Sequence, residues 1–215
     1  MNPISIQAMT VVTPDLLENF SEATFIPNFV LNDVIPKRPQ KRTRSPTLVY
    51  RPVGHPGKNH QEFSELATFF KDDRRIQFVI EAGNPGSVPN STVLQRMSEA
   101  EFVWDHLNGY YGVTSIEAWA CGAIALGAVS WECRNKIFEF WSQFPHWNDV
   151  SPSGSSLPFR GKSLQDIRVY LTRLCSNPDL LKDERVACHR FWRDIWQSRY
   201  IVDAYHDVYQ KAING

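Results

Sequence analysis

The sequence lacks a surplus of charge of either sign, and it lacks an apolar run of membrane-spanning length. Its 215 residues carry 23 lysines and arginines against 23 aspartates and glutamates, so the formal net charge is zero. A balanced charge gives no global attraction to nucleic acids or membrane surfaces. The longest nearly apolar stretch, 118–131, contains two glycines and a serine and is too short for a transmembrane helix. We therefore expect no membrane span.

Only one short basic run is a candidate for a local phosphate-binding patch. It comprises Lys37, Arg38, Lys41, Arg42 and Arg44, and prolines stand at positions 36, 39 and 46. Interleaved prolines deny such a run a rigid surface, which favours a solvated linker over a binding patch. The sequence thus gives no evidence of a nucleic-acid partner.

Cysteine is scarce and widely spaced. The four cysteines stand at 121, 133, 175 and 188 with no CxxC pair, so we expect no zinc cage and no other metal site. Cys121 and Cys175 have apolar neighbours and are typical of buried thiols in a reducing compartment. The first twelve residues contain neither Lys nor Arg, the basic region with which a secretory signal begins. We expect a cytoplasmic protein.

Apolar segments of strand length alternate with helical patterns along the chain. The expected strands are Thr47–Val53, Arg75–Glu81, Glu101–His106 and Ala123–Val129. The expected helices are Asn59–Lys71, Ser91–Ala100, Val113–Cys121, Glu132–Phe144, Ser163–Ser176 and a long region from Pro178 to about Ile213. This alternation predicts an α/β fold with a Rossmann-like, doubly wound parallel sheet. At about 150 residues per domain, the chain is one large domain or a domain with an appendage.

Helix-boundary residues support these ranges. Thr13 before Pro14 and Asn177 before Pro178 each predict an N-cap followed by a proline in the first turn. Gly122 follows the helix that ends at Cys121, where a left-handed residue is favoured.

Three large rings near the C-terminus share one helical face. Trp192, Trp196 and Tyr200 are spaced i, i+4, i+8. One interpretation is that this face packs on the chain's own sheet, and the other is that it is a surface for another domain or subunit.

Ligands of doubly wound sheets bind where the carboxyl ends of strands lead into helix N-termini. The loop after the first expected strand reads Gly54-His55-Pro56-Gly57-Lys58-Asn59-His60. Gly57 allows a close backbone approach, and the Lys58 ammonium at a helix start is a candidate phosphate ligand. The alternative is a glycine-proline turn followed by a solvated lysine.

A second loop leads from the strand at 101–106 into the helix at 113–121. Its glycine turn opens a helix whose first N–H groups, at Val113, Thr114 and Ser115, form a candidate anion site. Glu117 lies about one turn further on, where a carboxylate can accept hydrogen bonds from both hydroxyls of a ribose. The alternative role for Glu117 is favourable electrostatics at the start of a helix.

The residues of this second loop resemble a known family. The string Tyr111-Gly112-Val113-Thr114-Ser115-Ile116-Glu117-Ala118-Trp119-Ala120-Cys121-Gly122 resembles the signature F/Y-G-x-x-x-x-E-A-x-A-x-G of the nucleotide-sugar-binding domain of GT-B-fold glycosyltransferases. Val103–His106 with Gly109–Gly112 resembles the V-D-Q-x-x-x-G-x-Y-G loop of its retaining, group 1 or family 4-like branch. Gly57-Lys58-Asn59 stands where that family has a Lys-Gly pair.

The resemblance also divides the chain. Thr13–Leu17 and Ile26–Asn28 resemble the end of the family's N-terminal domain and the linker that follows. It implies an N-terminal segment over 1–45 and a single C-terminal-type GT-B domain over 46–215 with a helical C-terminal extension.

The resemblance implies roles for individual residues. The donor diphosphate would be bound by Lys58 and Gly57 from the first loop. From the second loop it would be bound by Gly112, Val113, Thr114 and Ser115. Glu117 would hold the ribose.

Two positions depart from the family pattern. Many members carry a second glutamate eight residues before the ribose-binding one, in contact with the transferred sugar, and here that position is Gly109. Asp105 is the candidate for a donor-sugar contact instead. The usual arginine partner of the lysine is missing, and His55 is the nearest cationic candidate, with a neutral structural role as the alternative.

The larger departure is the missing acceptor half, because family members do chemistry in a cleft between two domains. The resemblance therefore implies a donor-binding half that binds a nucleoside diphosphate or nucleotide-sugar, without another cofactor. It would transfer the glycosyl group only with a second protein or domain that supplies the N-terminal half. A non-catalytic nucleotide-binding protein, serving as a sensor or sequestering module, and an interaction protein that kept the fold are the alternatives.

Overall fold

A four-stranded parallel sheet forms the centre of the molecule. The computed structural model describes residues 8–37, 45–50, 59–80, 88–145, 147, 161, 163–196 and 198–214. The strands are β3 (Thr47–Tyr50), β4 (Gln77–Ile80), β5 (Phe102–Trp104) and β6 (Ile124–Leu126), in the order β4-β3-β5-β6. All neighbours pair in parallel. Each strand lies inside a predicted one, so the predicted parallel sheet is confirmed, although residues 51–53 and 81 lie outside the described ranges.

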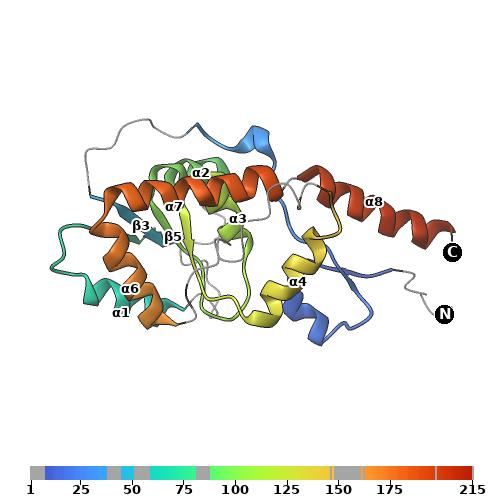
Figure 1. The fold of residues 1–215 in the computed structure, drawn as a ribbon, viewed down its shortest axis with the longest axis horizontal. Helices are drawn as coiled ribbons and strands as arrows, with labels where there is room; N and C mark the ends of the chain where they lie inside the picture. Colours follow the sequence, from blue (N-terminus) through green and yellow to red (C-terminus); the bar gives the residue numbers. More distant parts are fainter. Residues whose placement is uncertain are drawn as a thin grey trace.

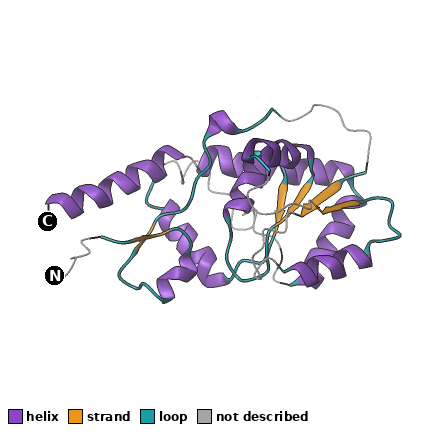
Figure 2. Ribbon diagram, turned by 180° about the vertical axis from the view of Figure 1, so that it is seen from behind, coloured by secondary structure: helices purple, strands orange, loops and turns teal. Residues whose placement is uncertain are grey.

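Helices cover the sheet on both sides, as a doubly wound fold requires (Figures 1 and 2). The helices are α1 (His60–Phe69), α2 (Asn90–Glu99), α3 (Val113–Ala120), α4 (Trp131–Trp141), α6 (Leu164–Cys175) and α7 (Pro178–Arg190). Helix α1 packs on α6, whereas α2 and α7 pack on α3. The chain runs from β3 to β4 in one direction and then back past β3 to β5. Because such connections are right-handed, the two connecting helices, α1 and α2, lie on opposite faces of the sheet.

The predicted helical region from Pro178 to about Ile213 is confirmed, but as three pieces. Helix α7 passes into a π-helical turn, η4 (Phe191–Ile195), and α8 (Ser198–Asn214) follows after a break. At the break, the Trp196 N–H donates to the carbonyl of Phe191, five residues back, at 3.0 Å. Such a wide turn rotates the side chains that follow, so the spacing of Trp192, Trp196 and Tyr200 does not describe one continuous helical face.

The aromatic side chains at this break belong to the core of the chain itself. Trp192 is 7% exposed and Trp196 is 1% exposed. The Trp196 ring lies 5.6 Å from Trp119 of α3 and 5.3 Å from Trp141 of α4, between ring centroids. The interpretation as a surface for another subunit is therefore wrong for Trp192 and Trp196, because both are covered within this chain.

The predicted helix boundaries have different local geometries. The Asn177 side chain accepts the Leu180 N–H at 3.0 Å, so this residue caps α7 as predicted. Thr13 precedes the 3-10 helix η1 (Pro14–Glu18), but its side chain does not cap that helix. Gly122 has a φ of 71°, the left-handed conformation expected after α3.

The N-terminal segment packs against the main body. It forms a two-stranded parallel sheet of β1 (Thr10–Val11) and β2 (Thr24–Phe25), with η1 between them and η2 (Asn32–Val34) after them. Helix η1 packs on α4. The Trp196 indole N–H donates to the Asn28 carbonyl at 2.8 Å, which fixes this segment to the C-terminal region. The division into 1–45 and 46–215 stays a prediction.

Three sequence expectations concern membrane spans, cysteines and metal sites among the described residues. None of the helices in this part of the chain is long and apolar enough to cross a membrane. The four cysteines form no disulfide; Cys121, Cys133 and Cys188 are buried, and Cys175 is half-buried. Within the same ranges, no three His, Cys, Asp or Glu side chains gather closely enough to hold a metal ion.

Candidate functional site

The sheet order places a topological switch point between β3 and β5. The chain leaves β3 toward β4 on one side, and it leaves β5 toward β6 on the other. At such a point the two loops separate at the carboxyl edge of the sheet and leave a crevice in which ligands bind. The predicted site residues belong to these two loops. Three of them, His55, Gly57 and Lys58, lie outside the described residues.

The start of α1 is tied directly to the loop after β5. Asn59, the residue before α1, has φ and ψ of 50° and 51°. Its side-chain oxygen accepts the Leu107 N–H at 2.6 Å, and its side-chain nitrogen donates to Glu62 at 3.0 Å. The start of α1 and the loop after β5 are therefore joined by the side chain of Asn59, which is not among the predicted site residues.

A buried carboxylate organises the N-terminus of α3. Asp105 follows β5 and is 1% exposed. Its Oδ2 accepts the Gly112 N–H at 2.9 Å and the Ser115 hydroxyl at 2.7 Å. A Cβ on Gly112 would lie 3.2 Å from both carboxylate oxygens, so any other residue here would crowd the Asp105 side chain and require it to shift. Hydrogen bonds to the ionised form make burial of the carboxylate tolerable.

The predicted residues of the second loop divide into an inner and an outer group. Asp105 and Ser115 are buried and bonded to each other. On the outer side, the Val113 side chain is 44% exposed, and those of Thr114 and Glu117 are half-buried. The outer group lies on the first turn and a quarter of α3 and is accessible from solvent. Gly112 is also half-buried, but its N–H is bonded to Asp105.

Gly109 joins the loop after β5 to the loop after β6. Its N–H donates to the Ala128 carbonyl at 3.1 Å, and its carbonyl accepts the Ser130 N–H at 2.6 Å. Its φ is 86°, which favours glycine over any L side chain. The missing glutamate thus coincides with a backbone conformation that a glutamate would adopt only with strain.

His106 is a second buried polar residue beside the switch point. Its Nε2 lies 3.8 Å from the Asp105 carboxylate, and its ring centroid lies 4.3 Å from that of Tyr110. His106 belongs to the family-like string but is not a predicted site residue. Its position directly after a buried strand is the only local signal, and the sequence does not show that its ring turns inward.

The carboxyl end of β3 is lined by aromatic groups. The Tyr50 ring lies 5.8 Å from His60 and 4.5 Å from Phe63, between centroids. Burial raises the pKa of Tyr50, and the nearby Glu62 carboxylate raises it further. The phenol therefore stays neutral at neutral pH and supplies no charge to the site.

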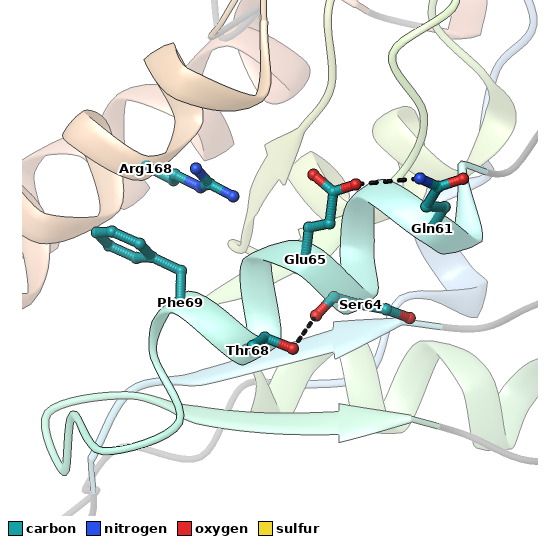
Figure 3. A pocket seen from close by; sticks show the side chains of 6 residues that line it. All are labelled: Gln61, Ser64, Glu65, Thr68, Phe69 and Arg168. Carbon is teal, nitrogen blue, oxygen red and sulfur yellow. Dashed lines mark hydrogen bonds between the residues drawn. The ribbon is translucent and has the colours of Figure 1, made fainter.

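A hollow lies beside α1, on the face that α1 turns toward α6 (Figure 3). It has a volume of about 480 Å³ and lies between α1 and α6. It is lined by Gln61, Ser64, Glu65, Thr68, Phe69 and Arg168. The Arg168 guanidinium lies 5.0 Å from the Phe69 ring centroid, so its cation stacks on the aromatic face. Of the predicted site residues that the structure describes, none is among those that line this hollow.

No family model and no curated protein matches the sequence. Solved structures do match the fold. A TarM variant from S. aureus, in complex with fondaparinux, alpha-GlcNAc-glycerol and UDP, is similar over 94% of this chain and 44% of its own, with a TM-score of 0.63 and 14% identity. The pneumococcal O-GlcNAc transferase GtfA, in complex with UDP and GlcNAc, is similar over 98% of this chain and 46% of its own, with a TM-score of 0.58 and 14% identity.

A third match comes from a plant enzyme. The catalytic domain of starch synthase IV from Arabidopsis thaliana, bound to ADP and acarbose, is similar over 97% of this chain and 56% of its own, with a TM-score of 0.57 and 10% identity. The chain has a Rossmann-like α/β fold that matches part of these GT-B structures. It spans only about half the length of these structures, and identities this low establish the fold alone.

Proposed function

We propose that this chain is the donor-binding half of a retaining, family 4-like glycosyltransferase. It would bind a nucleoside-diphosphate sugar and transfer the glycosyl group together with a partner domain or subunit. The main support for the proposal is the position of Glu117 on α3. This residue lies one turn after the N-terminus of the helix, and that N-terminus lies beside the switch point of the sheet.

The spacing along α3 suits a nucleoside diphosphate. Val113 and Glu117 are four residues apart, so they lie on one helical face about 6 Å apart along the axis. A phosphate at the amides of Val113 and Thr114 gains from the helix dipole. Its ribose would then extend along the same face to the Glu117 carboxylate. Ser115 would act indirectly, because its hydroxyl is bonded to Asp105.

Lys58 supplies the positive charge in this proposal. It directly precedes Asn59, whose side chain is bonded to the loop after β5. An ammonium there would offset the charge that develops on the diphosphate as the glycosyl bond breaks. Lys58 and the α3 N-terminus together would stabilise the leaving group without a metal ion or other cofactor.

The proposed partner would supply the acceptor half. The chain spans under half of TarM and GtfA. Its β1–β2 pair is a two-stranded parallel sheet, and a sheet of only two strands is marginally stable by itself. Parallel sheets are also normally covered on both faces. Helix α8 extends from the body toward the end where the N-terminal segment lies (Figure 1), and it exposes Val202, Tyr209 and Ile213. These features support a second Rossmann-like domain on this side.

Calorimetric titration with UDP, ADP and their glucose and N-acetylglucosamine conjugates tests donor binding. We expect saturable binding of at least one of them by the isolated chain, and sugar transfer only after the partner is added. Failure of the whole panel to bind would overturn the proposal.

A non-catalytic nucleotide-binding role is the second candidate. Gly109 favours it, because the missing glutamate is the family's contact to the transferred sugar and the φ of 86° fits glycine. The two roles differ in turnover: this candidate predicts nucleotide binding without transfer or hydrolysis of the sugar, with or without a partner.

A further inference from the structure

We propose that Trp131, the first residue of α4, is a stacking surface for the sugar of the donor. The inference rests on the proposed function, because it assigns a contact to the sugar end of the same donor. The ligand group is one apolar face of a pyranose ring, packed on the exposed indole. Neither the family-like strings nor the fold similarity gives Trp131 a role.

Trp131 differs from the other tryptophans in its exposure. The chain has seven tryptophans, and the structure describes them all. Five are buried and Trp147 is half-buried, whereas the Trp131 side chain is 65% exposed. An exposed indole leaves a large apolar surface in water, and tryptophan is enriched among the residues that dominate binding surfaces. Its exposure therefore points to contact with a ligand rather than to packing of the core.

The indole is held on a rigid element. The Ser130 hydroxyl accepts the Cys133 N–H at 3.1 Å, which caps the start of α4. Trp131, Arg134 and Phe138 are spaced i, i+3, i+7 and share one face of the helix. The Arg134 guanidinium lies 5.8 Å from the Trp131 ring centroid and 5.4 Å from that of Phe138. A cation that contacts both rings restricts the indole and lowers the entropy cost of binding.

Backbone hydrogen bonds place Trp131 beside the loop that follows β5. The Gly109 N–H donates to the Ala128 carbonyl at 3.1 Å, and the Gly109 carbonyl accepts the Ser130 N–H at 2.6 Å. Trp131 is the next residue along the chain. It therefore lies at the carboxyl edge of the sheet, where ligands of such folds bind.

The direction of the proposed donor brings its sugar toward α4. A nucleotide-sugar carries its ribose and its sugar at opposite ends of the diphosphate. With the diphosphate at the amides of Val113 and Thr114 and the ribose toward Glu117, the sugar extends from the α3 N-terminus over residues 108–112. This is the loop that Gly109 joins to the start of α4.

Helix α4 also borders the side on which the acceptor half is proposed. It packs on η1 of the N-terminal segment, and Figure 1 shows it next to that segment. A sugar that is to be transferred must face the acceptor. The C–H groups on one face of a pyranose ring pack well on an aromatic face, while the hydroxyls on its rim stay free to form hydrogen bonds.

Trp131→Ala tests the inference by calorimetric titration with UDP, ADP and their glucose and N-acetylglucosamine conjugates. We expect the sugar conjugate to bind about fivefold more weakly, the scale of one aromatic contact, whereas UDP or ADP binding stays unchanged. Trp131→Phe should restore most of the loss. The matched control is Phe69→Ala, because Phe69 is also an exposed ring, at 57%, with the Arg168 guanidinium 5.0 Å from its centroid. This control should change neither affinity.

The outcomes separate the inference from the proposed function. Equal weakening of UDP and its sugar conjugate in Trp131→Ala would overturn the inference alone, as would unchanged binding of both. Binding of UDP or ADP by the unmodified chain without binding of any sugar conjugate would also overturn it. Failure of the whole panel to bind would overturn the proposed function, and this inference with it.

Quenching of tryptophan fluorescence by acrylamide gives a second readout. Because five of the seven tryptophans are buried, Trp131 should supply most of the quenchable signal, and Trp131→Phe should remove that part. A bound sugar conjugate should lower the quenching of the unmodified chain, whereas UDP or ADP should not. Equal protection by the nucleoside diphosphate and its sugar conjugate would contradict a contact between the sugar and Trp131.

Discussion

The Asp105 carboxylate accepts the Ser115 hydroxyl at 2.7 Å, and both side chains are buried. This bond divides the site into two layers. The inner layer fixes where α3 begins, and the outer layer of Val113, Thr114 and Glu117 faces solvent, where the proposed ligand would bind. Ser115, predicted to bind the diphosphate, and Asp105, predicted to contact the donor sugar, are therefore bonded to each other in the interior, whereas the outer layer is accessible from solvent.

Asp105→Asn should destabilise the fold. The amide keeps the size of the side chain but loses the charge that binds the Gly112 N–H and the Ser115 hydroxyl. The amide oxygen can still accept both bonds, but as neutral ones, and the new NH2 group must find acceptors in the interior; together these changes should lower the free energy of unfolding by about 2–3 kcal/mol. Urea denaturation measures the change. Ser115→Ala removes only one of the bonds and should have a smaller effect; if it equals or exceeds that of Asp105→Asn, Asp105 does not organise this turn.

Glu117→Ala should weaken nucleoside diphosphate binding without changing the fold. Loss of a carboxylate that accepts both ribose hydroxyls should cost about 3 kcal/mol, roughly a hundredfold in Kd. A 2′-deoxy nucleoside diphosphate provides the control. The unmodified chain should bind the deoxy ligand more weakly than the ribose ligand, and Glu117→Ala should bind the two equally. A preference for ribose that survives in Glu117→Ala would place the ribose elsewhere.

The elements with strong local signals were predictable from the sequence. The apolar strands and the glycine at 122 are local features, and the structure has the strands and the left-handed residue where these features predict them. The break at Trp196 was not predictable, because its aromatic spacing also fits one continuous helix. What decides its geometry is distant: the Asn28 carbonyl, 168 residues away, accepts the indole N–H.

The candidate site shows the same limit. A serine in the first turn of a helix has the same sequence pattern whether its hydroxyl faces a ligand or a buried carboxylate. The Asp105–Ser115 bond depends on how β5 and α3 pack, which no local pattern encodes. The bond from Leu107 to Asn59 depends likewise on the pairing of β3 with β5.

Trp196→Ala should be among the most destabilising substitutions in the chain. The ring is 1% exposed, packs on Tyr111, Trp119 and Trp141, and donates a hydrogen bond to Asn28. Removal of a buried tryptophan costs about 3–5 kcal/mol, measurable by thermal or chemical unfolding. Trp131→Ala is the control: this ring is 65% exposed, and its loss should change stability by less than about 0.5 kcal/mol.

Cys175 should be a slow nucleophile at neutral pH. Burial raises the pKa of its thiol to about 11, with a further contribution from Asp73 that Arg75 opposes. The thiolate is the reactive form and exists mainly above the pKa, so roughly one thiol in a thousand is ionised at about pH 8. Alkylation by iodoacetamide, followed by peptide mass spectrometry, should accelerate about tenfold per pH unit up to about pH 11. A rate that levels off near pH 8 would contradict the raised pKa.

Gly109→Ala should reduce stability and leave nucleotide binding nearly unchanged, provided that Gly109 acts only as a turn. The space around a new Cβ is adequate, with Ser130 Cβ at 3.5 Å, so the effect should come from the φ of 86°. A left-handed alanine costs about 1–2 kcal/mol. Gly112→Ala is the informative comparison, because its Cβ would crowd Asp105 at 3.2 Å. Displacing that carboxylate moves the start of α3, so Gly112→Ala should weaken UDP or ADP binding as well as stability. If Gly109→Ala weakens binding more than Gly112→Ala, then the loop at Gly109 contacts the ligand and the site extends toward β6.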